Sequence, residues 1–109
     1  MYRGTTPVLP IEILGIDLTG ARVFLTIADE KNRNQFTLTA PDDFTVTYDS
    51  ENEKTVGDVV LTQKQTLSIQ AGNCTAQIRF IFPDGTADAT NTVPLTVDDV
   101  LLKGVISYE

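Results

Sequence analysis

The segment AQIRFIFPDGT, residues 76–86, places an apolar side chain at every second position until it reaches a turn. Ala76, Ile78, Phe80 and Phe82 alternate with Gln77, Arg79 and Ile81. Successive side chains of a β-strand point to opposite faces, so this spacing predicts a strand with one buried face. The Pro-Asp-Gly sequence at residues 83–85 is typical of a tight connection to a following strand.

The same two-residue period recurs along the rest of the chain. It predicts about seven strands, at residues 7–14, 21–28, 35–40, 43–49, 56–61, 74–82 and 86–97. Sixteen threonines strengthen this prediction, because β-branched side chains fit a pleated surface better than a helix. Short strands separated by turns at this spacing are typical of a sandwich or a barrel rather than an α/β fold. We therefore predict an all-β fold, a sandwich of about seven antiparallel strands.

One stretch departs from the strand pattern. The sequence TQKQ at residues 62–65 matches a capping box, in which Thr62 is the N-cap and the side chain of Gln65 bonds back to its amide. We expect a short helical turn near residues 63–66 that carries the chain from one sheet to the other. Leu67 and Ile69, which follow it, are expected to close the end of the core.

The length of 109 residues corresponds to one domain. We expect a single β-sandwich domain at residues 1–99, followed by an apolar C-terminal tail at residues 100–109. No run of about 18 apolar residues is present, so we predict no membrane span and no membrane partner. The N-terminus lacks the pattern of a secretory signal, which favours a chain made in the cytosol.

The composition excludes several kinds of function. Without histidine there is no imidazole general base and no imidazole metal ligand. One cysteine, Cys74, allows neither an internal disulfide nor a thiolate zinc site. Fifteen acidic against eight basic residues give a net charge of −7, which repels a nucleic-acid backbone. We expect no enzyme activity, no cofactor, no bound metal and no nucleic-acid partner.

Three features allow a chemical interpretation, but a simpler one is favoured for each. Residues 42–58 hold five of the seven net negative charges and suggest a calcium loop, yet the EF-hand spacing is absent. Asp98 and Asp99 suggest a carboxylate pair, but adjacent strand residues face opposite ways. Cys74 lies on the apolar side of its predicted strand and is expected to be a small buried hydrophobe.

The opening MYRGTTP, residues 1–7, resembles the start of small proteins encoded in the structural-gene regions of phages and prophages of Gram-positive bacteria. Residues 61–67, 76–87 and 102–106 resemble the same family, in the expected order. The layout is also similar to the N-terminal β-domain of the upper baseplate proteins of siphophages that infect lactic-acid bacteria. This resemblance implies an immunoglobulin-like sandwich that serves in a virion or its assembly, at the tail or baseplate.

The two ends of the chain are the predicted docking surface. The alternation breaks after Val97, and large apolar side chains follow it. The candidate interface residues are Tyr2, Arg3, Leu101, Leu102, Val105, Ile106 and Tyr108. An apolar tail of this kind either folds back on its own sheet or docks on another subunit, for example by adding a strand to an exposed edge.

These features and the resemblance together predict a non-enzymatic structural or assembly protein of a phage or prophage. We expect it in the virion, assembled in the cytoplasm of the bacterial host. Its expected partners are other phage structural proteins, with a homo-oligomer as a further possibility. A carbohydrate-binding or adhesion sandwich is the alternative, although the chain has no tryptophan to form a sugar platform.

Overall fold

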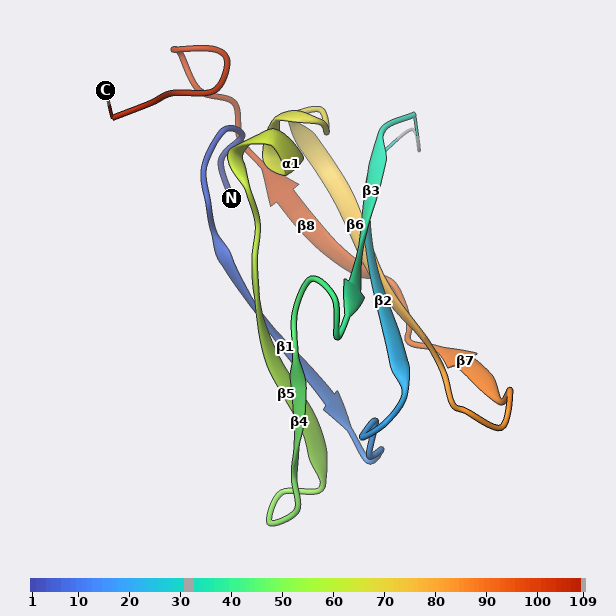
Figure 1. Ribbon diagram of the computed structural model, residues 1–109. Coiled ribbons are helices and arrows are strands. Elements are labelled where there is room, and N and C mark those ends of the chain that lie inside the picture. Colours follow the sequence, from blue (N-terminus) through green and yellow to red (C-terminus); the bar gives the residue numbers. More distant parts are fainter. Residues whose placement is uncertain (31–32, 109) are drawn as a thin grey trace.

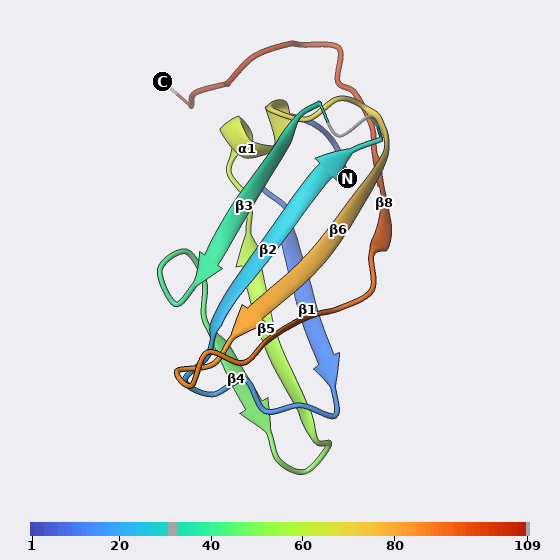
Figure 2. The ribbon, with the colours of Figure 1, turned by 90° about the vertical axis from the view of Figure 1, so that its right-hand side faces the viewer.

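The computed structural model describes residues 1–30 and 33–108. These residues form eight strands and one short helix, and the strands make two antiparallel sheets packed face to face (Figure 1, Figure 2). The all-β sandwich predicted from the alternating pattern is therefore confirmed. It has eight strands where about seven were predicted.

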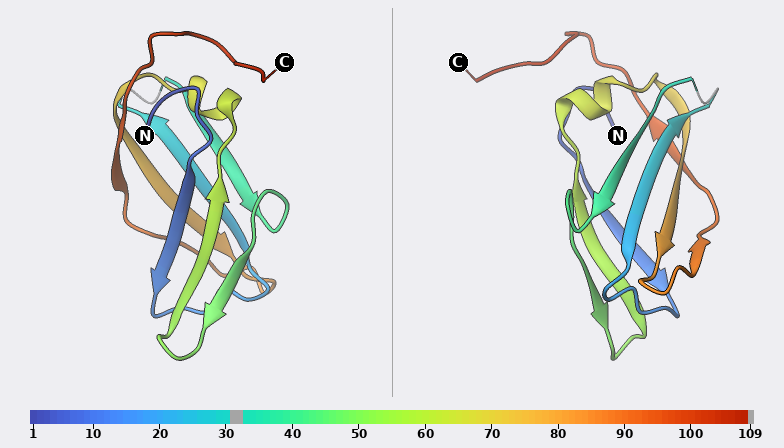
Figure 3. Two further views of the ribbon diagram at one scale, coloured as in Figure 1. Left: turned by 90° about the vertical axis from the view of Figure 1, so that its left-hand side faces the viewer. Right: turned by 45° about the vertical axis from the view of Figure 1, so that its right-hand side comes forward.

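The smaller sheet contains β1 (Val8–Leu14), β5 (Lys54–Val60) and β4 (Val46–Asp49), in that order. β1 forms one edge of this sheet and β4 the other, as the left view of Figure 3 shows. Gly57 sits in the middle of β5, where a Cβ atom would lie 2.7 Å from the carbonyl oxygen of Thr45. The missing side chain therefore lets the chain that enters β4 approach β5 closely.

The larger sheet is built around β2 (Arg22–Asp29) and β6 (Gly72–Ile81). β3 (Gln35–Ala40) pairs with the other side of β2. Two short strands share the remaining side of β6. β7 (Ala87–Ala89) pairs with the end of β6, and β8 (Val93–Val97) pairs with its beginning.

Alternate residues of the two sheets face each other and form the core. On β2, the three apolar residues Val23, Leu25 and Ile27 are all buried. Two residues of β6, Ile78 and Phe80, lie opposite Leu25 and Val23 and are buried as well. Full burial of one such side chain contributes about 1.5–3 kcal/mol, so each buried residue of the alternating runs stabilises the fold. The buried faces predicted for these two strands are confirmed.

The predicted helical turn is present as α1 (Gln63–Leu67). Thr62 is its N-cap: its hydroxyl accepts from the amide of Gln65 at 3.1 Å, and the Gln65 side chain accepts from the Thr62 amide at 2.9 Å. α1 connects β5 of the smaller sheet with β6 of the larger sheet (Figure 1). Ile69, just beyond it, is fully buried and closes this end of the core.

The prediction of one strand over residues 86–97 is wrong, because the chain leaves the sheet between β7 and β8. Thr90 is the cause. Its amide donates to the carbonyl oxygen of Ile78 at 2.8 Å, but its side-chain hydroxyl accepts from the Ile78 amide at 3.1 Å. The hydroxyl thus takes the place of a main-chain carbonyl, and the backbone is free to turn aside.

The strand predicted at residues 43–49 is shorter than expected and begins at Val46. Asp43 and Thr39 close a turn that carries the chain from the larger to the smaller sheet. The Asp43 amide donates to the Thr39 carbonyl oxygen at 2.6 Å, and its carboxylate accepts from the Thr39 amide at 2.8 Å. Phe44 is therefore buried without belonging to a strand. The polar sequence at residues 29–34 also predicts a hairpin loop, and its positions 31 and 32 lie outside the described residues.

Candidate functional site

The N-terminal segment lies against the C-terminal end of β8, at the end of the sandwich that carries α1 (Figure 1). The amino group of Met1 donates to the carbonyl oxygen of Thr96 at 2.8 Å. Tyr2 forms a parallel bridge with Asp98, and the amide of Arg3 donates to the Asp98 carbonyl oxygen at 2.8 Å. The structure therefore brings both groups of predicted docking residues, from the two ends of the chain, to one end of the molecule.

Arg3, one of the predicted docking residues, contacts other residues of its own chain. Its Nη2 donates to the carbonyl oxygen of Leu67 at 2.8 Å, and its Nη1 lies 3.3 Å from Oδ1 of Asp99. Its Nε is buried and has no acceptor within residues 1–30 and 33–108. Arg3 thus connects the end of α1 to the residue that precedes the tail. It holds the two ends of the chain together at the predicted docking surface, while Tyr2 beside it is half exposed.

The C-terminal tail, defined here as residues 100–108, leaves the body of the sandwich (Figure 3). Its large apolar side chains face solvent, with exposed fractions of 103% for Leu101, 72% for Leu102, 63% for Val105, 56% for Ile106 and 105% for Tyr108. Single exposed apolar residues are ordinary on a protein surface, but a group this dense is typical of an interaction site. The structure thus leaves these five predicted residues uncovered.

Polar contacts direct the tail across the end of the molecule. Nζ of Lys103 lies 2.8 Å from Oδ2 of Asp99. Gln63 of α1 binds both main-chain groups of Ile106. The Ile106 amide donates to Oε1 of Gln63 at 2.8 Å, and Nε2 of Gln63 donates to the Ile106 carbonyl oxygen at 3.1 Å. The tail consequently passes over α1 (Figure 2). The sequence interpretation did not anticipate the role of Gln63, because it links positions 43 residues apart.

Asp99 is the charged centre of this end of the molecule. Hydrogen bonds from the Lys103 side chain and from the Val100 amide hold the pKa of its carboxyl below the ordinary value of 3.8. The positive charges of Lys103 and Arg3 act in the same direction. Asp99 is therefore ionised at neutral pH, and its contacts with Lys103 and Arg3 anchor the base of the tail.

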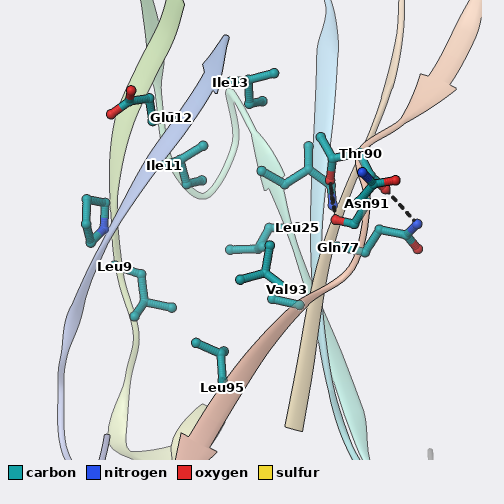
Figure 4. A pocket seen from close by; sticks show the side chains of 13 residues that line it. Leu9, Ile11, Glu12, Ile13, Leu25, Gln77, Thr90, Asn91, Val93 and Leu95 are labelled. Carbon is teal, nitrogen blue, oxygen red and sulfur yellow. Dashed lines mark hydrogen bonds between the residues drawn. The ribbon is translucent and has the colours of Figure 1, made fainter.

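A groove of about 450 Å³ opens along one side of the sandwich, between β1 and β8 (Figure 4). From β1, the side chains of Leu9, Ile11 and Ile13 point toward Leu25, Val93 and Leu95 (Figure 4). Pro10, Glu12, Ala76, Gln77, Ile78, Thr90 and Asn91 complete the lining. Glu12 is the one charged residue among these described lining residues, and its side chain points away from the hollow (Figure 4). The groove is therefore an apolar surface on an open side of the sandwich.

The strand on one side of this groove has an unpaired edge. Within the described part of the chain, β1 pairs with β5 alone. Pro10 lies in the middle of β1, and Pro94 lies in β8 on the other side of the groove. Proline cannot donate to a sheet ladder and is confined largely to edge strands. These two prolines are the signal in the sequence that could have located the groove, which the sequence interpretation missed.

The acidic stretch at residues 42–58 does not gather into a cation site. Asp42 pairs with Arg22 at 3.0 Å, and Asp49 accepts from the Asn52 side chain at 2.8 Å in the turn before β5. The hydrogen bond from Asn52 lowers the pKa of Asp49 below 3.8. Among the residues that the structure describes, no three Asp, Glu, His or Cys side chains lie close enough together to hold a metal ion.

Cys74 is buried, with 1% of its surface exposed, and its thiol lies 3.7 Å from the carbonyl oxygen of Gln70. Burial raises the pKa of the thiol above 9.0, and the negative charges of Asp29 and Glu30 raise it further. Nucleophilic cysteines need the opposite environment, one that lowers the pKa and leaves the sulfur accessible. The prediction that Cys74 is a small buried hydrophobe is confirmed.

A scan against family models and searches of curated proteins and of solved structures find no match to the chain. No helix in the described residues is long and apolar enough to cross a membrane. Two surfaces of the molecule are the candidate functional sites. These are the exposed tail at the α1 end and the apolar groove between β1 and β8.

Proposed function

We propose that this chain is a non-enzymatic structural or assembly protein of a phage or prophage particle, associated with the tail or baseplate. Its partners are other virion proteins or further copies of the chain, and it joins the particle in the cytoplasm of the host. The resemblance of residues 1–7, 61–67, 76–87 and 102–106 to such proteins suggests this setting. The exposed tail supports docking as the activity.

The observation that carries the proposal is the exposure of five large apolar side chains within the tail, each by more than half. Burial of one such side chain contributes about 1.5–3 kcal/mol, so three of them contribute about 5–9 kcal/mol. Association itself costs an estimated 4–15 kcal/mol in lost translational and rotational freedom. A single tail therefore docks weakly. Copies held together in a particle dock persistently, because the effective concentration of each contact is high.

The charge distribution supports apolar docking through the tail. Residues 100–109 contain one basic residue, Lys103, and one acidic residue, Glu109, so the net charge of −7 belongs to residues 1–99. Like charges oppose direct contact between two acidic bodies, and they oppose contact with nucleic acid. A neutral, apolar segment that extends from an acidic body is a contact that avoids this repulsion.

The composition of purified particles tests the proposal. Particles released from cells that carry the gene are purified on a density gradient, and mass spectrometry measures the chain in its full form and in a form that ends at Asp99. We expect the full chain at a constant ratio to the other virion proteins and the shortened form in the soluble fraction. Absence of the full chain from the particles, or equal incorporation of both forms, would contradict the proposal.

A further inference from the structure

We infer that the groove between β1 and β8 receives the tail of a second copy of this chain, which adds a strand antiparallel to β1. The inference rests on the proposed docking function and adds the surface that accepts the tail. Strand addition to an exposed sheet edge is a recurrent mode of recognition, in which main-chain hydrogen bonds give affinity and side-chain pockets give specificity. The free edge of β1 and the apolar lining of the groove offer both.

The main-chain groups at the free edge of β1 can be assigned from its pairing with β5. The Leu61 amide donates to the carbonyl oxygen of Pro7 at 3.0 Å, so the odd-numbered residues of this segment bond toward β5. The direction alternates from one residue to the next in an antiparallel pair. Glu12 and Leu14 therefore present their amide and carbonyl groups to an added strand. Pro10 presents a carbonyl oxygen alone.

The tail has the side-chain pattern of a strand that suits this position. Its even positions carry Leu102 and Ile106 with Gly104 between them, and its odd positions carry Lys103 between Leu101 and Val105. In an extended strand these two sets face opposite sides. β1 has the same arrangement, because its apolar odd positions face the groove while Glu12 points away from it (Figure 4).

One antiparallel register satisfies both faces at once. It pairs Lys103 with Glu12, Leu101 with Leu14, Leu102 with Ile13, Gly104 with Ile11, Val105 with Pro10 and Ile106 with Leu9. Lys103 and Glu12 then meet on the outer face, where Leu101 also lies against Leu14 and Val105 against Pro10. On the inner face, Leu102 meets Ile13 and Ile106 meets Leu9. In this register the Val105 amide donates to the Pro10 carbonyl oxygen. Proline has no N–H, but this hydrogen bond uses only its carbonyl group, so the Val105 amide has an acceptor.

The direction of the chain excludes its own tail from this register. β8 runs toward the α1 end and β1 runs away from it, so a tail that folded back from the end of β8 would run parallel to β1 (Figure 1, Figure 2). An antiparallel strand must enter at the Leu14 end of β1. That end lies about 17 Å from Leu9, which is the length of an extended segment from Leu9 to Leu14. A second copy can supply it. The two bonds between Gln63 and Ile106 hold the tail while it is undocked, and docking exchanges them for the new ladder.

The tail and the groove are different surfaces, so the contact is head-to-tail. Such contacts generate rings when the rotation between copies closes, and open filaments when it does not. The charges allow this assembly, because Glu12 is the single charged residue that lines the described groove. It lies 3.4 Å from Lys54, and Lys103, which exchanges Asp99 for Glu12 on docking, adds a second cation beside it. The acidic bodies need not touch. We therefore expect the association to proceed beyond a dimer as the concentration rises.

Sedimentation velocity of the purified full chain at increasing concentration provides the first test. The variant Val93→Arg places a charge at the mouth of the groove, where Val93 is 55% exposed, and Val60→Arg is the matched control on β5, outside the groove, where Val60 is 60% exposed. We expect the native chain and Val60→Arg to associate, while Val93→Arg and the chain ending at Asp99 remain monomeric. Association of Val93→Arg equal to that of Val60→Arg would overturn the inference.

Disulfide trapping tests the register. Residues opposite each other in a hydrogen-bonded antiparallel pair have Cα atoms about 5.5 Å apart, which a disulfide can bridge. A Glu12→Cys chain mixed with a Lys103→Cys chain should form a mixed disulfide at least about tenfold faster than Val60→Cys with Lys103→Cys, because docking raises the effective concentration of the two thiols. Cys74 is too buried to compete. Equal rates would overturn the inference. If the tail is still needed for entry into particles while the pure chain stays monomeric, the docking function stands and the second-copy inference fails.

Discussion

Removal of residues 100–109 should leave the sandwich folded. In the described structure no residue of the tail belongs to the buried core, and Val100 is the one residue of this segment that is even half-buried. The interactions that truncation after Asp99 removes therefore lie on the surface. We predict a folded monomer that has lost the docking activity and little of its stability.

The magnitude follows from the interactions that the tail makes with the body. The two exposed hydrogen bonds between Gln63 and Ile106 contribute about 0.5 kcal/mol each. Partial burial of Val100 contributes about as much as one of these bonds. The ion pair of Lys103 with Asp99 is exposed and adds little. The expected loss is below about 2 kcal/mol, against a total stability of about 5–15 kcal/mol for a domain. Ile69→Ala, a cavity in the core, should cost about 2–5 kcal/mol.

Urea unfolding followed by far-ultraviolet circular dichroism measures the difference. With a slope of about 1–3 kcal/mol per molar urea, a loss below about 2 kcal/mol lowers the midpoint of the truncated chain by less than about 2 M at the shallowest slope and less than about 0.7 M at the steepest, with the slope itself unchanged. Ile69→Ala in the full chain provides the internal reference for a core residue. If the truncated chain unfolds without cooperativity, or loses as much as Ile69→Ala, the tail belongs to the core and our reasoning is refuted.

Three further predictions concern stability and pH. Gly57→Ala should cost about 1–3 kcal/mol in urea unfolding, because its Cβ would collide with the Thr45 carbonyl oxygen, and a cost near zero would contradict this. Thr62→Ala should cost about 1 kcal/mol by loss of the α1 cap, whereas Thr62→Ser should be close to native. The pKa of Asp99 is lowered from 3.8, so its anchoring of the tail should be present above about pH 3.8 and lost as the pH falls through the lower pKa. An NMR titration of the Val100 amide, which donates to Asp99, measures this loss. An amide chemical shift that stays unchanged down to pH 2 would refute the prediction.

The features of the fold that depend on neighbouring residues were predictable from the sequence. The two-residue period located β2 and β6 because the inner face of a sandwich is apolar whatever strand lies beside it. The α1 cap was predictable because all of its hydrogen bonds lie within four residues, from Thr62 to Gln65. Local chemistry and tertiary structure agree at these positions.

The break between β7 and β8 was not predictable, because it depends on a distant partner. Thr90 follows the alternation well enough to extend a strand, and what interrupts the pairing is the bond of its hydroxyl with Ile78, twelve residues earlier. The groove was missed for a similar reason. It exists because β1 and β8 lie beside each other in different sheets, and an alternating pattern does not specify which strands become edges.

The candidate site was predictable in part. Apolar residues after the last strand identified the tail, and the structure leaves Leu101 and Tyr108 fully exposed. Residue type alone does not separate two roles at Arg3, because arginine is common both at interfaces and in contacts that hold a chain together. The structure shows its bonds to Leu67 and Asp99, and its role in docking stays a prediction.

Binding of the isolated tail to the isolated body tests the central claim most directly. A synthetic peptide of residues 99–109 is titrated into the chain that ends at Asp99, in an isothermal calorimeter, with Val93→Arg and Val60→Arg bodies alongside. We predict saturable binding of one peptide per body, retained with Val60→Arg and lost with Val93→Arg. No heat of binding to any body at millimolar peptide, or equal binding to both variants, would contradict the claim that the tail docks in the groove.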